Sequence, residues 1–141
     1  MKIDLIGLLE NFYLRLPGLS TEIKEFIVKI LPYLSLVFGF LITLASVLEI
    51  IGTPVLSVFT LQGKGLPVIQ ILLLTNALGI AQGVLMIFAF KALRRRLQTG
   101  WRLLFWGQIL WIIASVISLS PSLLFGVILL YPFFQVKKYY N

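Results

Sequence analysis

Few residues of this chain have side chains suited to chemistry, and most of them lie within or beside long apolar stretches. The chain contains neither cysteine nor histidine, which excludes disulfides, Cys/His zinc sites and Cys-His or Ser-His-Asp nucleophile pairs. Glu49 is the acid nearest to an apolar stretch, two residues before Ile51. A cation or proton site at Glu49 is one interpretation, but we favour an acid at the membrane interface that reaches water.

Uncharged polar side chains recur in the second and third apolar stretches. They are Gln70, Thr75, Asn76, Gln82, Gln108, Ser115 and Ser118. The two stretches flank an arginine-rich loop and run antiparallel, so the depth of each residue can be counted from that loop. Gln82 and Gln108 then lie at similar depth, and Asn76 and Ser115 form a second matched pair. We expect a hydrogen bond within each pair, worth about 0.6–2 kcal/mol.

A glycine pair on the second stretch adds to this packing interpretation. Gly79 and Gly83 are four residues apart, so they share one helix face and allow close backbone approach. We interpret the polar residues and the glycines as contacts that hold helices together. The alternative is a polar path for a small solute, which would need several copies of the chain or a partner because no charge lies at mid-membrane.

The elements that position these residues follow from the apolar content of the chain. Of its 141 residues, 60% are hydrophobic and 12% charged, against about 45–50% and 25% in a soluble domain. A mean hydropathy of +1.03 indicates a chain whose solvent is lipid. The formal net charge of +7 would suggest nucleic acid for a soluble protein, whereas here it is interpreted as membrane topology.

Charged residues are absent from three ranges, 30–48, 65–90 and 103–136. The third, with 34 residues, is too long for one crossing and must fold back. Ser120 and Pro121 predict the turn, with Ser120 as N-cap of a new helix; one long helix kinked at Pro121 is the alternative. The sequence therefore predicts an all-α polytopic membrane protein, with four transmembrane helices at about 32–51, 68–90, 102–118 and 121–136 in one domain over 31–141.

The basic residues are divided unequally between the two ends of these spans. Eleven of the twelve fall in the N-terminal segment, the loop before the third span and the C-terminus, and Lys64 alone falls on the other side. The positive-inside rule places both termini in the cytoplasm. We expect the membrane to be a bacterial inner membrane or another energy-transducing membrane. Arg94, Arg95 and Arg96 are interpreted as contacts with anionic lipid or, alternatively, an acidic partner protein; nucleic acid is not expected.

Residues 1–30 precede the first span and predict an amphipathic segment at the cytoplasmic interface. Apolar residues recur at helical spacing over 3–16, with charged residues between them, and Pro17 ends this helix. Ser20 or the threonine after it caps a second short helix. Pro32 either starts the first span afresh or kinks a continuous helix, and we expect a bend there.

Aromatic residues near the predicted span ends are typical of an interfacial belt. They are Trp101, Trp106, Tyr131, Tyr139 and Tyr140. In the loop 52–67 on the opposite side, Thr53 and Pro54 predict the start of a short outer helix.

Two segments carry a resemblance to known proteins. They are Gly100-Trp101-Arg102-Leu103-Leu104-Phe105 after the basic loop and the ending Leu130-Tyr131-Pro132-Phe133-Phe134-Gln135-Val136-Lys137-Lys138-Tyr139-Tyr140. Together they resemble uncharacterised small bacterial four-span membrane proteins, some of which are labelled chromate-transporter-like. The resemblance implies a four-span architecture and no functional residues, because chromate carriers are longer and these spans hold no obvious anion site.

The sequence contains no Gly-rich phosphate loop, paired carboxylates or metal-ligand cluster. We therefore expect a non-catalytic protein without a metal or cofactor, acting as an accessory, structural or assembly subunit of a larger membrane complex. Its partners would be membrane lipids and other membrane subunits or further copies of itself. The alternative is an oligomeric transporter or channel for a small solute or ion, lined by Asn76, Gln82 and Gln108 with Glu49 near its mouth. A third interpretation is a carrier whose apolar groove holds the isoprenoid tail of a lipid or pigment.

Overall fold

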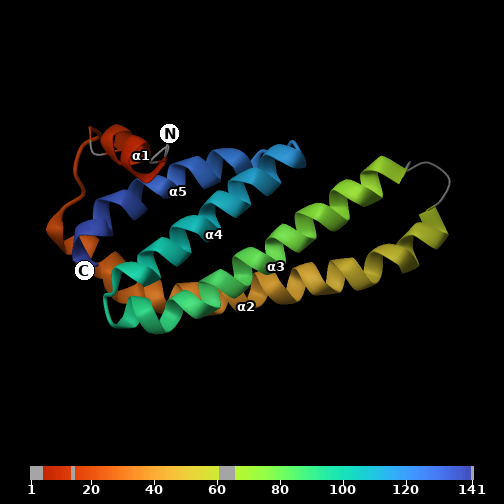
Figure 1. The fold of residues 1–141 in the computed structure, drawn as a ribbon, viewed down its shortest axis with the longest axis horizontal. Coiled ribbons are helices and arrows are strands. Elements are labelled where there is room, and N and C mark those ends of the chain that lie inside the picture. Colours follow the sequence, from red (N-terminus) through yellow and green to blue (C-terminus); the bar gives the residue numbers. More distant parts are fainter. Residues whose placement is uncertain (1–4, 14, 61–65, 141) are drawn as a thin grey trace.

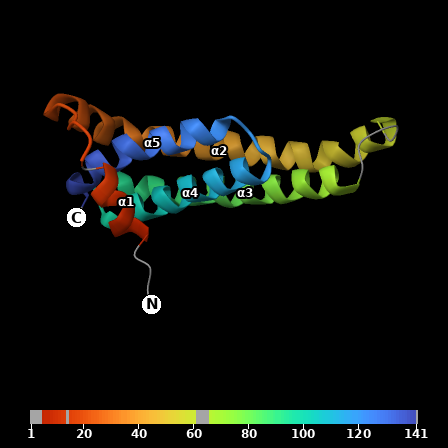
Figure 2. The ribbon, with the colours of Figure 1, turned by 90° about the horizontal axis from the view of Figure 1, so that it is seen from above.

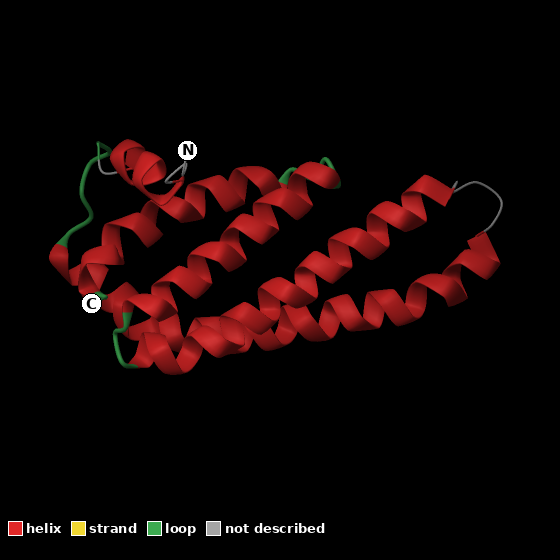
Figure 3. Ribbon diagram, in the orientation of Figure 1, coloured by secondary structure: helices red, strands yellow, loops and turns green. Residues whose placement is uncertain are grey.

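The computed structural model describes residues 5–13, 15–60 and 66–140, and these ranges contain helices and turns but no strand (Figure 3). The helices are α1 (Leu5–Tyr13), α2 (Thr21–Thr60), α3 (Leu66–Arg94), α4 (Gln98–Ile117), α5 (Ser122–Val136) and the short 3-10 helix η1 (Lys137–Tyr139). The all-α prediction is confirmed for this part of the chain. Among the described residues, three segments are long and apolar enough to cross a membrane: Thr21–Gly52, Ile69–Arg94 and Gln98–Ile117.

The four long helices form two antiparallel hairpins, α2 with α3 and α4 with α5 (Figures 1 and 2). The hairpins meet where α3 packs beside α4, next to the short turn that joins them. Toward the other end α3 and α4 diverge, and the α2–α3 hairpin extends well beyond the α4–α5 turn (Figure 1). α1 packs against α5 at an angle to it, and the N-terminal helix, the α3–α4 turn and the C-terminus share one end of the molecule (Figures 1 and 2).

Helix α2 continues without interruption through Pro32 and through Pro54 to Thr60. The prediction that Pro54 starts a separate outer helix is therefore wrong, as is the alternative in which Pro32 begins a new helix. A proline removes one backbone hydrogen bond. Ending the helix in apolar surroundings would instead leave up to four carbonyl groups without partners, so continuation is less costly. The start of α2 follows the prediction, because the Ser20 hydroxyl accepts a hydrogen bond from the backbone N–H of Ile23 at 3.4 Å.

The predicted fold-back within the third charge-free range is confirmed, and the single kinked helix is wrong. The N-cap prediction is also wrong, because α5 begins at Ser122 and its N-cap is Pro121 rather than Ser120. The hydroxyl of Ser120 accepts hydrogen bonds from the backbone N–H of Ser122 at 3.3 Å and from its hydroxyl at 2.9 Å. Leu119 has φ 49°, a left-handed conformation that closes the end of α4. In this closure the N–H of Ser120 donates to the carbonyl of Ser115 at 2.9 Å.

An aromatic core forms the best-buried part of the described molecule, at the end that holds the α3–α4 turn. Trp101, Phe105 and Phe134 are each 1% exposed or less, and their ring centroids lie 5.5–5.8 Å apart. The indole Nε1 of Trp101 donates to the carbonyl of Phe133 at 3.0 Å. The interfacial-belt prediction is therefore wrong for Trp101, and also for Tyr140, which is 3% exposed. Packing of α4 against α5 buries the ring of Trp101.

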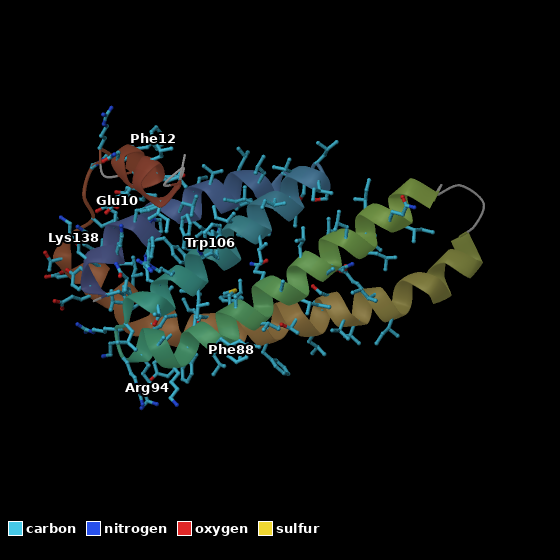
Figure 4. All side chains as sticks on the ribbon, viewed as in Figure 1. Glu10, Phe12, Phe88, Arg94, Trp106 and Lys138 are labelled. Carbon is cyan, nitrogen blue, oxygen red and sulfur yellow. The ribbon has the colours of Figure 1, made fainter. Side chains whose placement is uncertain are left out.

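Helix α1 is tied to the bundle along one face. Tyr13 is 5% exposed, and its hydroxyl donates to the carbonyl of Val127 in α5 at 2.9 Å. Glu10 forms an ion pair with Lys137, just after the end of α5. Phe12 is 63% exposed and points away from the bundle (Figure 4). The amphipathic pattern of this helix thus gives one face to α5 and leaves the other uncovered.

Candidate functional site

A cavity of about 550 Å³ lies between the two hairpins and is lined by residues of all four long helices. We call it the central groove. Its walls are mainly apolar and aromatic, and include Leu34, Phe38, Met86, Trp111, Leu129 and Phe133. Leu34, Phe38 and Leu129 are 43%, 49% and 41% exposed, so the groove opens sideways between α2 and α5. In a membrane this opening would face lipid.

Gln82 and Gln108, predicted at matched depth, both line the central groove. They are 6% and 8% exposed. The hydrogen bond predicted between them is not formed, because Nε2 of Gln108 donates instead to the carbonyl of Gly126 in α5 at 3.0 Å. The Gln82 side chain makes no hydrogen bond with another described residue, and it packs beside Gly107 of α4. The groove therefore contains one amide already engaged by the fold and one that is not.

The second predicted pair, Asn76 with Ser115, is also not formed. The Ser115 hydroxyl lies 2.9 Å from that of Ser122, so α5 again supplies the partner. Asn76 is 7% exposed, and its Nδ2 has no hydrogen-bond partner among the described atoms. α3 and α4 diverge with distance from the turn that joins them (Figure 1), and Asn76 and Ser115 are both well over ten residues from that turn, which explains why matched depth does not bring the two side chains together.

Gly79 and Gly83 face α2. A Cβ on Gly83 would lie 2.6 Å from the carbonyl oxygen of Gly39, and a Cβ on Gly79 would meet the hydroxyl of Ser46. The absence of side chains thus allows α2 and α3 to touch through their backbones. Gly39 was not singled out from the sequence. It belongs to a series of small residues at 35, 39, 43 and 46, and that spacing of three and four is the signal that identifies this face.

Glu49 lies on an exposed part of α2, three residues beyond Ser46. Because Ser46 is opposite Gly79 and the helices are antiparallel, Glu49 lies at the level of Asn76, three residues before Gly79. Twenty residues separate it from Lys29, or about 30 Å of helix, which is close to the thickness of a hydrocarbon core. An acid at an outer interface fits this position.

A second cavity, also of about 550 Å³, lies between the start of α2 and the end of α3. Its lining includes Glu22, Glu25 and Lys29 from α2, with Arg94 and Arg96 at the end of α3. Arg96 has φ 55°, which ends α3 and turns the chain toward α4. Figure 4 shows Arg94 extending from the body of the molecule. Both signs of charge meet here, so the arginines are not a purely basic patch.

Within residues 5–13, 15–60 and 66–140, no group of three or more His, Cys, Asp or Glu side chains is placed to hold a metal ion. Comparisons with family models, curated proteins and solved structures find no match to the chain. The resemblance to small four-span bacterial membrane proteins therefore stays a prediction.

Proposed function

We propose that this chain is a non-catalytic integral protein of a bacterial inner membrane, or a comparable energy-transducing membrane, with four transmembrane helices and both termini in the cytoplasm. In this proposal it serves as an accessory, structural or assembly subunit of a larger membrane complex. The observation that carries the proposal is the large apolar surface that α2 and α3 leave uncovered.

The arrangement of the helix ends supports a fourth span. α4 and α5 fold back on each other, so the C-terminus returns to the end at which α4 begins (Figure 1). α5 has 15 residues and is about 22 Å long, somewhat less than a hydrocarbon core of about 30 Å. A bilayer that thins around the α4–α5 turn accommodates this length at a modest cost in free energy.

The distribution of charge supports the orientation. The α3–α4 turn carries Arg94, Arg95 and Arg96, and the C-terminus carries Lys137 and Lys138. Both segments lie at the end shared with α1 (Figures 1 and 4). Under the positive-inside rule, the end that gathers Lys and Arg faces the cytoplasm. Lys64, the basic residue assigned to the opposite side, lies outside the described residues.

An exposed apolar ridge on α2 supports the role of subunit. The ridge comprises Tyr33, Val37, Phe40, Leu44, Leu48 and Ile51, each 43–63% exposed and spaced by three or four residues. In α2 and in α3, only 17% of the most apolar 18-residue stretch is buried within the chain, whereas in α4 the share is 39%. The ridge is thus a continuous surface on which a helix of another subunit can pack.

Site-specific photocrosslinking in native membranes tests this proposal. We expect benzoylphenylalanine at Phe40, which is 60% exposed on the ridge, to crosslink to one other membrane protein. The matched control is Phe125 on α5, which is 66% exposed and outside the ridge, and which should give mainly lipid adducts. Lipid adducts alone at both positions, together with a monomer that carries no other protein through gentle-detergent purification, would contradict the role of subunit.

The oligomeric transporter remains the second candidate because of one observation at the outer part of the α2–α3 hairpin. The carboxylate-bearing Glu49 lies level with the buried, unpartnered Nδ2 of Asn76. Crosslinks from Phe40 to a second copy of the chain would favour this candidate. It further requires ion or solute flux into proteoliposomes that Glu49→Gln abolishes and Glu25→Gln, at the opposite end of α2, leaves unchanged.

A further inference from the structure

The central groove combines an apolar interior with a buried hydrogen-bonding group. Gln82 is 6% exposed, lines the groove and has no hydrogen-bond partner among the described residues. The amide atoms of Gln82 are not among the fully buried side-chain atoms that lack a partner, so they are accessible from the groove. A ligand that supplies a hydrogen-bond partner to this amide gains free energy beyond the burial of apolar surface. Gln108 adds a carbonyl oxygen whose own amide nitrogen is held by Gly126. The groove therefore suits an apolar molecule that carries a polar group.

The volume of the groove indicates whether its occupant is a helix or a small molecule. A transmembrane helix is 10–12 Å across, so about 550 Å³ would hold only about one turn of it. The same volume lies well within the range of about 300–1,000 Å³ that is usual for sites of small organic ligands. A helix of a partner or of a second copy therefore does not fit, whereas a ring with an attached chain does.

The depth of Gln82 excludes an ordinary phospholipid as the partner of its amide. Twelve residues separate Gln82 from Arg94 at the end of α3, or about 18 Å of helix. In a hydrocarbon core of about 30 Å this is close to the middle, where the chains of a phospholipid carry no hydrogen-bonding group. The ligand must therefore be an uncharged lipid whose polar group can lie at mid-membrane.

We propose that the central groove binds a neutral lipid of the quinone type, with a carbonyl oxygen of its ring accepting a hydrogen bond from the Gln82 amide. Trp111, Phe38 and Phe133 line the groove, and aromatic side chains pack favourably against a flat ring. The attached chain leaves through the opening between α2 and α5. This ligand site is independent of whether the chain serves as a subunit or a transporter.

Binding to the purified full chain in lipid nanodiscs tests the proposal, with a benzoquinone that carries a decyl chain as the probe. We expect saturable quenching of tryptophan fluorescence that is largely lost in Trp111→Phe. Gln82→Leu should weaken binding about tenfold, the effect of one hydrogen bond. It should also raise the unfolding temperature of the ligand-free protein, because it removes an unpartnered amide, so loss of binding is distinguishable from misfolding. The matched control is Gln70→Leu, an exposed position on the same helix outside the groove, which should bind as the wild type does.

Three further arms make the result decisive. Decylbenzene has a ring and a chain but no carbonyl. Its affinity for the wild-type protein, measured by displacement of the quinone, should be no higher than the affinity of the quinone for Gln82→Leu. Ala114→Phe, which places a ring in the groove, should abolish binding of both probes. Changing the nanodisc lipid from zwitterionic to anionic should leave quinone binding unchanged. Equal affinity for the two probes, or full affinity in Gln82→Leu, would overturn the proposal.

Discussion

The left-handed backbone of Leu119 is a local strain that a single substitution can relieve. Leu119 has φ 49° and is 91% exposed, so its side chain contributes little packing within the chain. A non-glycine residue in this conformation costs about 1–2 kcal/mol. We predict that Leu119→Gly raises the free energy of unfolding in detergent by about 1 kcal/mol, measured by circular dichroism during denaturant titration.

Leu124→Gly is the matched control for Leu119→Gly. Leu124 is 68% exposed but lies within α5, where glycine costs about 1 kcal/mol in conformational entropy. The two substitutions remove the same side chain and should change stability in opposite directions. A loss of stability in both would show that the backbone at Leu119 is not strained.

The buried phenol of Tyr140 makes stability depend on alkaline pH. Burial raises the pKa of Tyr140 to about 12. The positive charge of Arg96 acts in the opposite direction, but its effect is smaller than that of burial. An unfolded tyrosine titrates near pH 10, so between pH 10 and 12 the unfolded state loses its proton first and folding becomes less stable as the pH rises. Below pH 10 this contribution is constant.

We predict that Tyr140→Phe removes this part of the alkaline loss. Its hydroxyl has no partner among the described atoms, so the substitution should also raise stability at pH 8 by about 1 kcal/mol. The measurement is the difference between the unfolding free energies of the two proteins from pH 8 to 12, in which other titrating groups cancel. A difference that does not grow above pH 10, or a less stable variant at pH 8, would contradict the prediction.

At the scale of helices, the contact between Gly39 and Gly83 sets the distance between α2 and α3. A Cβ on Gly83 would lie 2.6 Å from a backbone oxygen, which cannot move without shifting the whole helix. We predict that Gly83→Ala lowers the free energy of unfolding by about 1–3 kcal/mol, measured in the same denaturant titration. The control is Gly52→Ala in α2, where a Cβ meets nothing within 4 Å, and it should be neutral or stabilising by up to about 1 kcal/mol. Equal effects of the two substitutions would contradict this role of Gly83.

Helix breaks were predictable only where the local side chains could replace lost backbone hydrogen bonds. The turn was predicted from Ser120 and Pro121, and the hydroxyls of the serines within 118–122 do form hydrogen bonds there. Pro32 has leucine and tyrosine as neighbours, and α2 runs through it. A proline by itself was therefore an insufficient signal for a helix end.

Counting residues along a helix predicted depth but not the direction in which a side chain points. Gln82 and Gln108 do line one groove, as their matched depth suggested. Their hydrogen bonding was predicted incorrectly because α5, which lies beside α4, offers the carbonyl of Gly126. The rotation of each helix and the neighbour on its other side depend on the packing of all four, which no single stretch of sequence contains.

At the scale of the whole molecule, the number of times the chain crosses the membrane depends on the side of the membrane at which the α4–α5 turn lies. Composition predicted a membrane protein, and three helices are long and apolar enough to span a bilayer. α5, with 15 residues, is too short for length alone to decide. The proposal of four spans therefore depends on α4 and α5 crossing together.

Accessibility of single cysteines tests this claim most directly, because the natural chain contains no cysteine and each variant carries one thiol. In intact spheroplasts, a membrane-impermeant maleimide should label Leu119→Cys in the α4–α5 turn. Thr99→Cys at the start of α4 and Lys138→Cys near the C-terminus should be labelled only after the membrane is permeabilised. Labelling of Lys138→Cys from outside would instead indicate three spans, and failure to label Leu119→Cys from outside would indicate a hairpin that enters and leaves on the cytoplasmic side.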